Sequence, residues 1–544
     1  MNHNKIFLIA LITVLSITSC KKQLDISNTN KPTPESAETE SGVLLLGQGA
    51  IYRNGFYDLK YSDGVYGRFW AGATGFLALM GDEIGAEAAN AFMNQIGMPN
   101  KVTLDNGTVV TNPSAVNTQY ALLRTINSNQ QSGSNPTFYE WAYMYNMITA
   151  ANTVLDIAGK VKFSGTDAAT KKATVQAWAY WWKGYAYAHI GTLYYAGIIQ
   201  NATTATATTN GNYVTKEAII TESNANFDKA ITALGAATAS GTYTETLEKL
   251  IPEFLFKGKG GALSTAMWVH SINTMKARNI LLNTTKAAMT AAQWGSVLTL
   301  VNNGVAETDL IFTGRTDING DFLGTTIAEK IQSTGAATGT YKLSERWVQE
   351  FRTGDKRKDN NVKALTATGI FNTDRGNIFN TRYTLASAGT GLAGVIVWSN
   401  ASSGANEITL AATYEENELM KAEALIMTGQ IDLGVQSIDK VRTYQGAGLP
   451  AAGAGLTLAA AYEELRSERR IALAFRGLSF FDARRWEIIA PDKSRTGAVV
   501  ISAAGVVSTN ATINYGYLDY WDVPDNELAY NPALTGSAPI KNPK

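Results

Sequence analysis

Segments with the apolar spacing of α-helices follow one another along most of this chain, and they constrain the fold more than any other feature. Residues 414–444 hold two such segments, separated by a turn at 428–430. Residues 173–197 form another, in which apolar side chains cover nearly every side, so we expect it at the centre of the core. The pattern predicts an all-α protein with helices of roughly ten to twenty residues.

The paired segments are similar to tetratricopeptide units. Small residues such as Ala422, Ala424 and Gly429 allow two antiparallel helices to approach closely, and larger residues fill the groove toward the next pair. The chain shows no strict period of about 34 residues. We therefore expect degenerate tetratricopeptide-like helix pairs, interrupted by long insertions.

The insertions differ from the helical segments in composition. Residues 99–135, 200–215 and 363–406 are rich in Thr, Asn, Gly and Ser, and the last of them is expected to hold short strands. Residues 498–520 alternate enough between apolar and polar side chains to predict a hairpin. Because loops of this length in a compact fold are usually functional or mobile, the insertions are candidates for function.

The N-terminus has the order of a bacterial lipoprotein signal. Lys5 supplies a short basic region, and residues 6–17 form an apolar run that is too short to span a bilayer. Cys20, the only cysteine, follows Thr18 and Ser19 at the position where such a signal places the acylated residue. We expect a signal peptide at 1–19 and lipidation of Cys20, which would hold the protein at a membrane. The alternative is an ordinary secreted protein with a cysteine near the cleavage point.

The mature chain is expected to begin with a tether. Residues 20–40 are polar, include Pro32 and Pro34, and offer little to bury. Beyond the tether we expect an N-terminal helical region at 41–300 and a C-terminal region at 301–544, packed together as one globular body.

Composition excludes several classes of function. The chain has 46 basic and 46 acidic side chains, so it lacks the basic excess typical of a protein that binds nucleic acid. With one cysteine and three histidines it cannot build a His/Cys metal cluster, and we expect no metal and no cofactor. His189 and His270 lie in helix-like segments, where packed or surface positions are the simplest interpretation.

Residues 465–486 collect six arginines between aromatic and aliphatic side chains. The planar guanidinium can hold carboxylates and carbonyls while its stem packs on aromatic rings. We therefore interpret these arginines as an internal network that fixes a C-terminal helix to its neighbours. Glu416 and Glu423, seven residues apart on one helical face, are expected partners. A role in ligand binding is the alternative.

This stretch resembles the C-terminal signature of the SusD/RagB family of lipoproteins. The matching positions are Glu468, Arg469, Leu473, Phe475, Gly477, Phe481, Asp482, Arg484, Arg485 and Trp486. Ala472, Arg476 and Ser479 depart from it, since the family usually has acidic residues at the first two and often arginine at the third. Residues 272–282, 343–359, 415–450 and 523–532 follow the order of other family motifs.

The resemblance implies an all-helical SusD-like fold with tetratricopeptide-like pairs, long irregular loops and a few short strands. It implies a lipid-anchored protein on the outer face of the outer membrane, which captures an oligosaccharide and delivers it to a SusC-like TonB-dependent transporter. Such proteins are not enzymes. The nearest alternative is a RagB-type protein that takes up peptides. A secreted glycoside hydrolase and a purely structural scaffold are weaker alternatives.

Candidate ligand-binding residues follow partly from the resemblance and partly from loop composition. The segment after Asp82 is where family members often place ligand contacts. The loop at 314–324 combines charge with an aromatic ring, and the loop around 398 places an indole among polar residues, where it could equally be a buried anchor. The resulting candidates are Phe92, Asn94, Gln95, Arg315, Asp317, Asp321, Phe322 and Trp398. The spacing of Asp317 and Asp321 does not complete an EF-hand, so we interpret that loop as a solvated turn.

Overall fold

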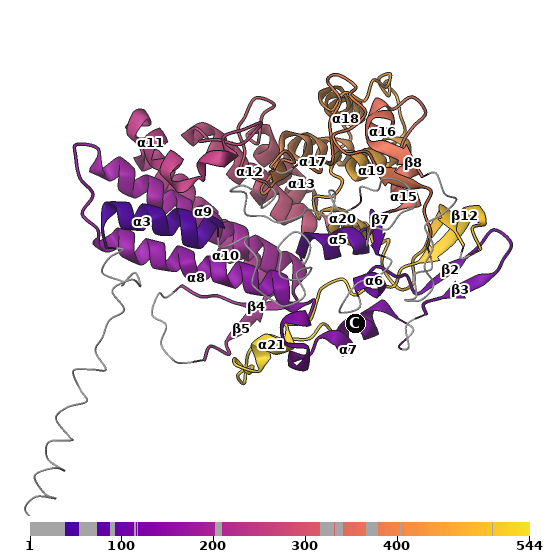
Figure 1. The fold of residues 1–544 in the computed structure, drawn as a ribbon, viewed down its shortest axis with the longest axis horizontal. Coiled ribbons are helices and arrows are strands. Elements are labelled where there is room, and N and C mark those ends of the chain that lie inside the picture. The colour runs from indigo at the N-terminus through magenta and orange to yellow at the C-terminus, as the bar shows by residue number, and fades with distance from the viewer. Residues whose placement is uncertain are drawn as a thin grey trace, which may run out of the picture.

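The computed structural model describes residues 38–53, 73–86, 93–113, 116, 118–201, 209–315, 331, 341–365, 379–402, 404–502 and 504–544. Within these ranges the protein is mainly helical with a few short strands, so the predicted fold class is confirmed (Figure 1). None of the described helices is long and apolar enough to cross a membrane. The predicted signal peptide and Cys20 lie outside the described residues.

The N-terminal helices pack around α9 (Ala168–Leu193). Its neighbours α8 (Phe138–Lys160) and α10 (Lys216–Ala236) run alongside it in Figure 1. Trp178, Trp181 and Trp182 of α9 are fully buried and meet Trp268 and Phe312 through tilted and edge-to-face ring contacts. The segment predicted to be apolar on nearly every side therefore lies at the centre of the core.

A second run of helices continues the stack. Each packs on the next in the order α12 (Thr265–Leu282), α13 (Ala291–Asn302), α17 (Tyr414–Met427), α18 (Ile431–Tyr444) and α19 (Leu458–Ala472). Gly429, with φ of 84°, makes the predicted turn between α17 and α18. A Cβ atom at Gly434 would lie 2.7 Å from the carbonyl oxygen of Ala422, so the close approach of the two helices requires glycine there.

The strands form several small sheets. The predicted hairpin is present as β11 (Arg495–Ile501) and β12 (Val507–Asn514). It joins β2 (Lys101–Thr103) and β3 (Val109–Thr111) in a sheet of order β11-β12-β2-β3, in which Ile513 pairs with Val102. The other strands pair in twos: β1 (Ile84–Ala86) with β7 (Tyr341–Leu343), β4 (Ala196–Ile198) with β5 (Tyr213–Thr215), β6 (Thr313–Gly314) with β10 (Ile408–Thr409), and β8 (Val362–Ala364) with β9 (Tyr383–Leu385).

Shorter helices connect these parts. They are α3 (Glu40–Leu46), η1 (Gly47–Arg53), α5 (Gly75–Met80), α6 (Met93–Ile96), α7 (Gln119–Ile126), η3 (Asn129–Ser134), α11 (Ser240–Leu250), η4 (Glu253–Leu255), η5 (Lys286–Ala288), α15 (Glu345–Val348), α16 (Lys356–Asn361), α20 (Ser479–Arg485) and α21 (Asp525–Leu528). The main buried apolar cluster includes residues from both the 41–300 and the 301–544 regions.

The arginines of residues 465–486 form the predicted internal network. Arg484 donates to three carbonyl oxygens, and each of the other five pairs with at least one carboxylate. Glu423 accepts both Nη groups of Arg485 at 2.6 and 2.7 Å, as predicted. The prediction for Glu416 was wrong, because it pairs with Arg278 of α12. Seven residues separate the two glutamates by about 10 Å along the helix, so they face different neighbours.

A candidate ligand-binding pocket

A cavity of about 600 Å³ opens where the irregular loop at 388–409 meets the ends of α17 and α18. Because these helices are antiparallel, the first residue of α17, Tyr414, lies beside the last residue of α18, Tyr444. We call the cavity the tyrosine pocket. Its remaining walls come from Lys259, from residues 305–311 and from the turn at 474–476.

The two tyrosines present both apolar and polar surface to the cavity. Their rings meet nearly edge to face, with centroids 5.0 Å apart and an interplanar angle of 69°. Burial raises the pKa of each to about 12, so both hydroxyls remain protonated at neutral pH. Neither hydroxyl forms a hydrogen bond with a described residue. An aromatic face with an unused hydroxyl suits a ligand that has C–H faces and hydroxyl groups.

Two carboxylates are held in fixed orientations at the pocket. Oε1 of Glu407 accepts the backbone N–H groups of Lys259 and Gly260 at 2.9 and 3.2 Å, and burial raises the pKa of Glu407. Oδ2 of Asp309 lies 2.8 Å from Nδ1 of His270 and accepts the N–H of Ala306 at 2.8 Å. The second oxygen of each carboxylate makes no hydrogen bond with the described part of the chain, so both retain an acceptor for a ligand.

Arg476 and Lys259 are the cations of the pocket. Arg476 donates to Thr413 Oγ1 at 2.8 Å and to Glu415 Oε1 at 3.0 Å. Burial of Glu415 opposes ionisation, but Arg476 holds the pKa of this carboxyl below its usual value. Lys259 Nζ lies 5.6 Å from the ring centroid of Tyr444. The arginine that departs from the family signature therefore shapes this pocket.

Trp398 borders the pocket but belongs mainly to the aromatic cluster behind it. It is 8% exposed, and its ring lies 5.3 Å from that of Trp347 and 5.8 Å from that of Phe351. Its backbone N–H donates to Asn361 Oδ1 at 3.0 Å, which fixes the loop. The indole Nε1 is buried without a hydrogen-bond partner among the described residues. Trp398 thus offers the pocket little exposed ring surface.

The structure brings two of the sequence-predicted residues to one region. Arg315 is 5% exposed, donates to the carbonyl of Gly404 at 2.9 Å and lies 3.7 Å from Glu407, beside the pocket that Trp398 borders. Gln95 lies in α6, whose packing partners are α5, α7 and β1, so it is not part of this pocket. Phe92, Asp317, Asp321 and Phe322 lie outside the described residues, as does the side chain of Asn94.

Backbone strain also marks the pocket. Among the described residues, four that are not glycine have positive φ, and two of them, Ala388 with φ of 59° and Phe475 with φ of 61°, line the tyrosine pocket. Left-handed backbone at such residues costs on the order of 1–3 kcal/mol and persists at sites that the surrounding structure holds in place. Phe475 is held by its ring contact with Trp347, 5.1 Å between centroids.

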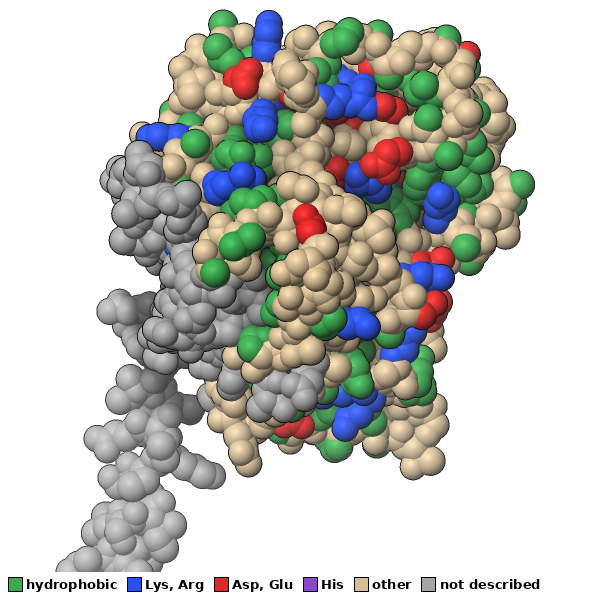
Figure 2. Space-filling model, turned by 90° about the vertical axis from the view of Figure 1, so that its right-hand side faces the viewer, with side chains coloured by type: hydrophobic (Ala, Val, Ile, Leu, Met, Phe, Trp, Pro, Cys, Tyr) green, Lys and Arg blue, Asp and Glu red, His purple; other side chains and the backbone are tan. Residues whose placement is uncertain are grey.

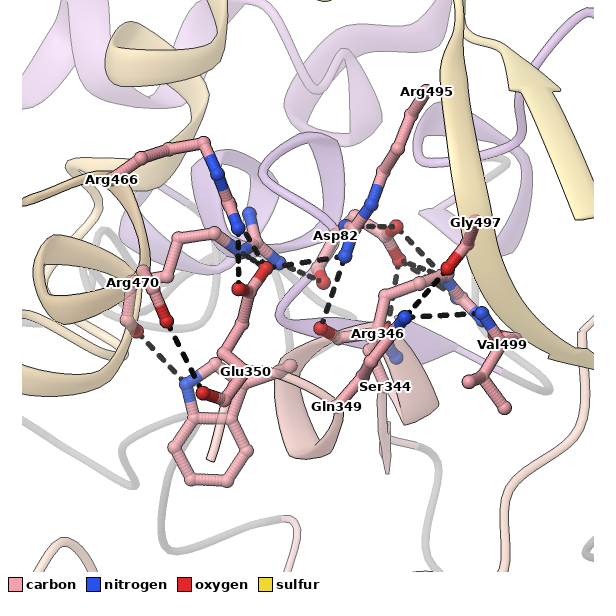
Figure 3. Close-up of polar contacts among 12 residues, drawn as sticks. Asp82, Ser344, Arg346, Gln349, Glu350, Arg466, Arg470, Arg495, Gly497 and Val499 are labelled. Atoms are coloured by element: carbon pink, nitrogen blue, oxygen red, sulfur yellow. Dashed lines mark hydrogen bonds and ion pairs between the residues drawn. The ribbon is translucent and has the colours of Figure 1, made fainter. Parts of the chain in front are cut away.

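A second cavity, of about 510 Å³, differs in character. We call it the arginine cleft, because Arg466 and Arg470 of α19 and Arg495 of β11 line it (Figure 3). Arg466 contacts both oxygens of Glu350, at 3.0 and 2.7 Å, and Arg495 reaches the same carboxylate at 3.1 Å.

Asp82 is the other anion at the centre of the arginine cleft. It accepts Nε and Nη2 of Arg346, between 2.7 and 3.0 Å, and the hydroxyl of Tyr515 at 2.6 Å. Burial opposes ionisation, but Arg346, Arg495 and Arg470 hold the pKa of Asp82 well below its usual range. The charges of the cleft are thus largely occupied with one another. Figure 2 shows one face of the molecule, on which basic (blue) and acidic (red) side chains lie side by side around a hollow.

Part of the chain matches a known protein family. Residues 393–542, which include the arginine-rich stretch, match a family model described as the SusD family. The resemblance to the SusD family is confirmed. No curated protein matches the chain.

Solved SusD-like structures share the fold over nearly the whole chain. A SusD superfamily protein from Bacteroides vulgatus is 13% identical with a TM-score of 0.58, covering 91% of this chain and 98% of that one. A SusD-like carbohydrate binding protein from the same organism is 13% identical with a TM-score of 0.56, covering 94% and 98%. NanU from B. fragilis is 14% identical with a TM-score of 0.55, covering 95% and 100%. At these identities the likeness establishes the fold alone.

Sequence reasoning missed most of the tyrosine pocket. Tyr414 and Tyr444 occupy the ends of helices and belong to no motif. The one available signal was that an antiparallel helix pair brings the start of its first helix beside the end of its second. Glu407 follows the predicted loop residue Trp398 by nine positions, but its orientation depends on two backbone amides 147 and 148 residues away.

Proposed function

We propose that the protein is a cell-surface lipoprotein that binds an oligosaccharide in the tyrosine pocket and passes it to a SusC-like TonB-dependent outer-membrane transporter. It binds this ligand without altering it. The SusD-like fold supports the class of protein, and the pocket supports the class of ligand.

The observation that carries the ligand assignment is the combination of groups in one cavity. Tyr414 and Tyr444 offer ring surface for the C–H faces of a sugar. Their hydroxyls, with the free oxygens of Glu407 and Asp309, offer partners for sugar hydroxyls. A volume of about 600 Å³ lies within the usual range for small-ligand sites.

Calorimetric titration with a panel of oligosaccharides, both neutral and amine-bearing, tests the ligand class. The proposal expects saturable binding to the purified protein and unchanged saccharide after prolonged incubation, as seen by chromatography. Cleavage products would indicate a hydrolase. If no oligosaccharide of the panel gives a heat of binding, the oligosaccharide assignment is wrong.

The anchor is tested separately. Cys20→Ser removes the thiol that would carry the lipid chains, so the variant should leave the membrane fraction. If Cys20→Ser and the unaltered protein sediment with membranes to the same extent, the lipoprotein assignment is wrong. Isolation of the protein from solubilised outer membranes should recover a TonB-dependent barrel, and its absence would contradict the transport role.

A further inference from the structure

We propose that the tyrosine pocket selects ligands that carry a protonated amine. This inference rests on the proposed function, because it specifies the ligand of the same pocket. The amine can belong to an amino sugar or to a peptide, and the experiment below distinguishes these sources.

The charge of the pocket is the first observation. Glu307, Asp309, Glu407 and Glu415 line it, against the two cations Lys259 and Arg476. Counting Arg315, which lies 3.7 Å from Glu407, still leaves four acidic groups against three basic ones among the described residues. His270 beside Asp309 adds a positive charge only when it is protonated.

The cations of the pocket are also occupied. Arg476 is held by Glu415 and Thr413, and Lys259 Nζ donates to the carbonyl oxygen of Glu307. By contrast, the carboxylate of Glu307 is exposed and forms no hydrogen bond within the described ranges. The groups left for a ligand are therefore acceptors and negative charges.

An ammonium group fits this set. It brings three N–H donors and one positive charge, so it can donate to the free oxygen of Glu407 or of Asp309, both of which line the pocket. The ring of Tyr414 adds cation–π attraction, whereas the ring of Tyr444 already lies 5.6 Å from Lys259 Nζ. Besides burial, neighbouring glutamates, Glu307 among them, raise the pKa of both tyrosines, which agrees with a negative potential at the rings. Acetylation of the amine removes the charge and most of the donors.

Paired ligands isolate the amine. Oligomers of β-1,4-linked glucosamine and of N-acetylglucosamine share one backbone, and a short lysine peptide and its acetyl-lysine form make the second pair. Calorimetry on the full mature chain measures both pairs. We expect the free amine of at least one pair to bind about tenfold or more tightly than its acetylated form, equivalent to about 1.4 kcal/mol. The pair that shows this gain identifies the source of the amine.

Charge-neutral variants test whether the pocket causes the preference. Glu307→Gln alters an exposed side chain, and Glu407→Gln keeps a carbonyl oxygen for the amides of Lys259 and Gly260. Both variants should reduce the amine preference severalfold, whereas the matched control Glu245→Gln, on the exposed side of α11, should leave it unchanged. Thermal unfolding confirms that each variant is folded.

Each result decides the inference. Equal affinity for free and acetylated amines, or a preference that survives both pocket variants, overturns it. If neutral oligosaccharides bind without any gain from the amine, the proposed function stands and the amine selection fails. If no saccharide or peptide binds, both fail.

Discussion

The tyrosine pocket and the arginine cleft are cavities of similar size built from opposite uses of charge. In the arginine cleft, Asp82 and Glu350 face the guanidinium groups of Arg346, Arg466, Arg470 and Arg495, and each carboxylate has several partners. In the tyrosine pocket, the carboxylates of Glu307, Asp309 and Glu407 and the two tyrosine hydroxyls retain oxygens that form no hydrogen bond with the described residues. A charged cavity therefore indicates a ligand only when its charged groups are not already paired with one another.

The difference also separates stability from binding. Buried charges without partners are expensive, so the arginine cleft should be sensitive to the loss of any member. The partly exposed groups of the tyrosine pocket remain hydrated when no ligand is bound, and their loss should affect binding more than folding.

Asp82→Asn should give the largest loss of stability. It leaves Arg346 buried without its carboxylate, and removal of one partner of a buried pair typically costs about 3–5 kcal/mol. Asparagine tolerates the positive φ of 54° at this position, so the effect reports on charge rather than on backbone strain. Urea denaturation measures it. A loss no greater than that of Glu245→Gln would show that the cleft does not depend on charge pairing.

Glu83→Gln should change how stability depends on pH. Glu83 is fully buried beside the cleft, accepts the N–H of Phe475 at 3.2 Å, and has a pKa that burial raises to about 8. The folded protein thus keeps a proton that the unfolded chain loses above its pKa of 4.5. The stabilising contribution of this proton is complete below pH 4.5 and declines until the pH passes about 8.

Glutamine has no proton to lose, so the free energy of unfolding of the Glu83→Gln variant should decline less between pH 5 and 8 than that of the original protein. The gap between the two proteins should reach on the order of a few kcal/mol. Denaturation at several pH values measures this gap. Parallel profiles for the two proteins would show that Glu83 ionises normally in the folded state.

Tyr444→Leu should weaken ligand binding about tenfold, or about 1.4 kcal/mol, because the aromatic face and hydroxyl are lost. Tyr444→Phe keeps the ring and separates the two contributions. The partly exposed position should limit the effect on folding. Calorimetric titration with the tightest-binding ligand of the panel provides the measurement. Unchanged affinity in the leucine variant would show that the ligand binds elsewhere on the protein.

Glu463→Gln should have the smallest effect. Glu463 pairs with Arg466 at the rim of the arginine cleft, but its side chain is 64% exposed. Exposed pairs contribute roughly 0.2–1 kcal/mol, and salt screens them. Denaturation at low and high salt should show a small difference that shrinks with salt. A loss of stability comparable to that of Asp82→Asn would mean that the ion pairs at the rim and at the centre of the cleft are energetically coupled.

The sequence predicted those features that depend on local pattern. The helical spacing predicted α9, α17 and α18, and Gly429 predicted the turn between the last two. The alternation near residue 500 predicted the β11–β12 hairpin. The arginine network was also predictable, because six guanidinium groups among apolar residues must find partners inside the fold.

What could not be predicted depends on contacts between distant segments. Glu416 and Glu423 have the same local pattern, yet Glu416 pairs with an arginine of α12 and Glu423 with an arginine of α20. The tyrosine pocket joins Lys259, the loop at 388–409 and the ends of α17 and α18, and no motif links these positions. Trp398 was identified as a loop aromatic, but only its contacts with Trp347 and Phe351 reveal how little of it reaches the cavity.

The most direct test of the account compares one ligand titrated into two folded variants, Tyr444→Leu in the tyrosine pocket and Arg495→Gln in the arginine cleft. We predict that affinity falls about tenfold in the first and stays within about twofold of the original in the second. Loss of affinity in Arg495→Gln with full binding by Tyr444→Leu would place the ligand in the arginine cleft and contradict binding in the tyrosine pocket.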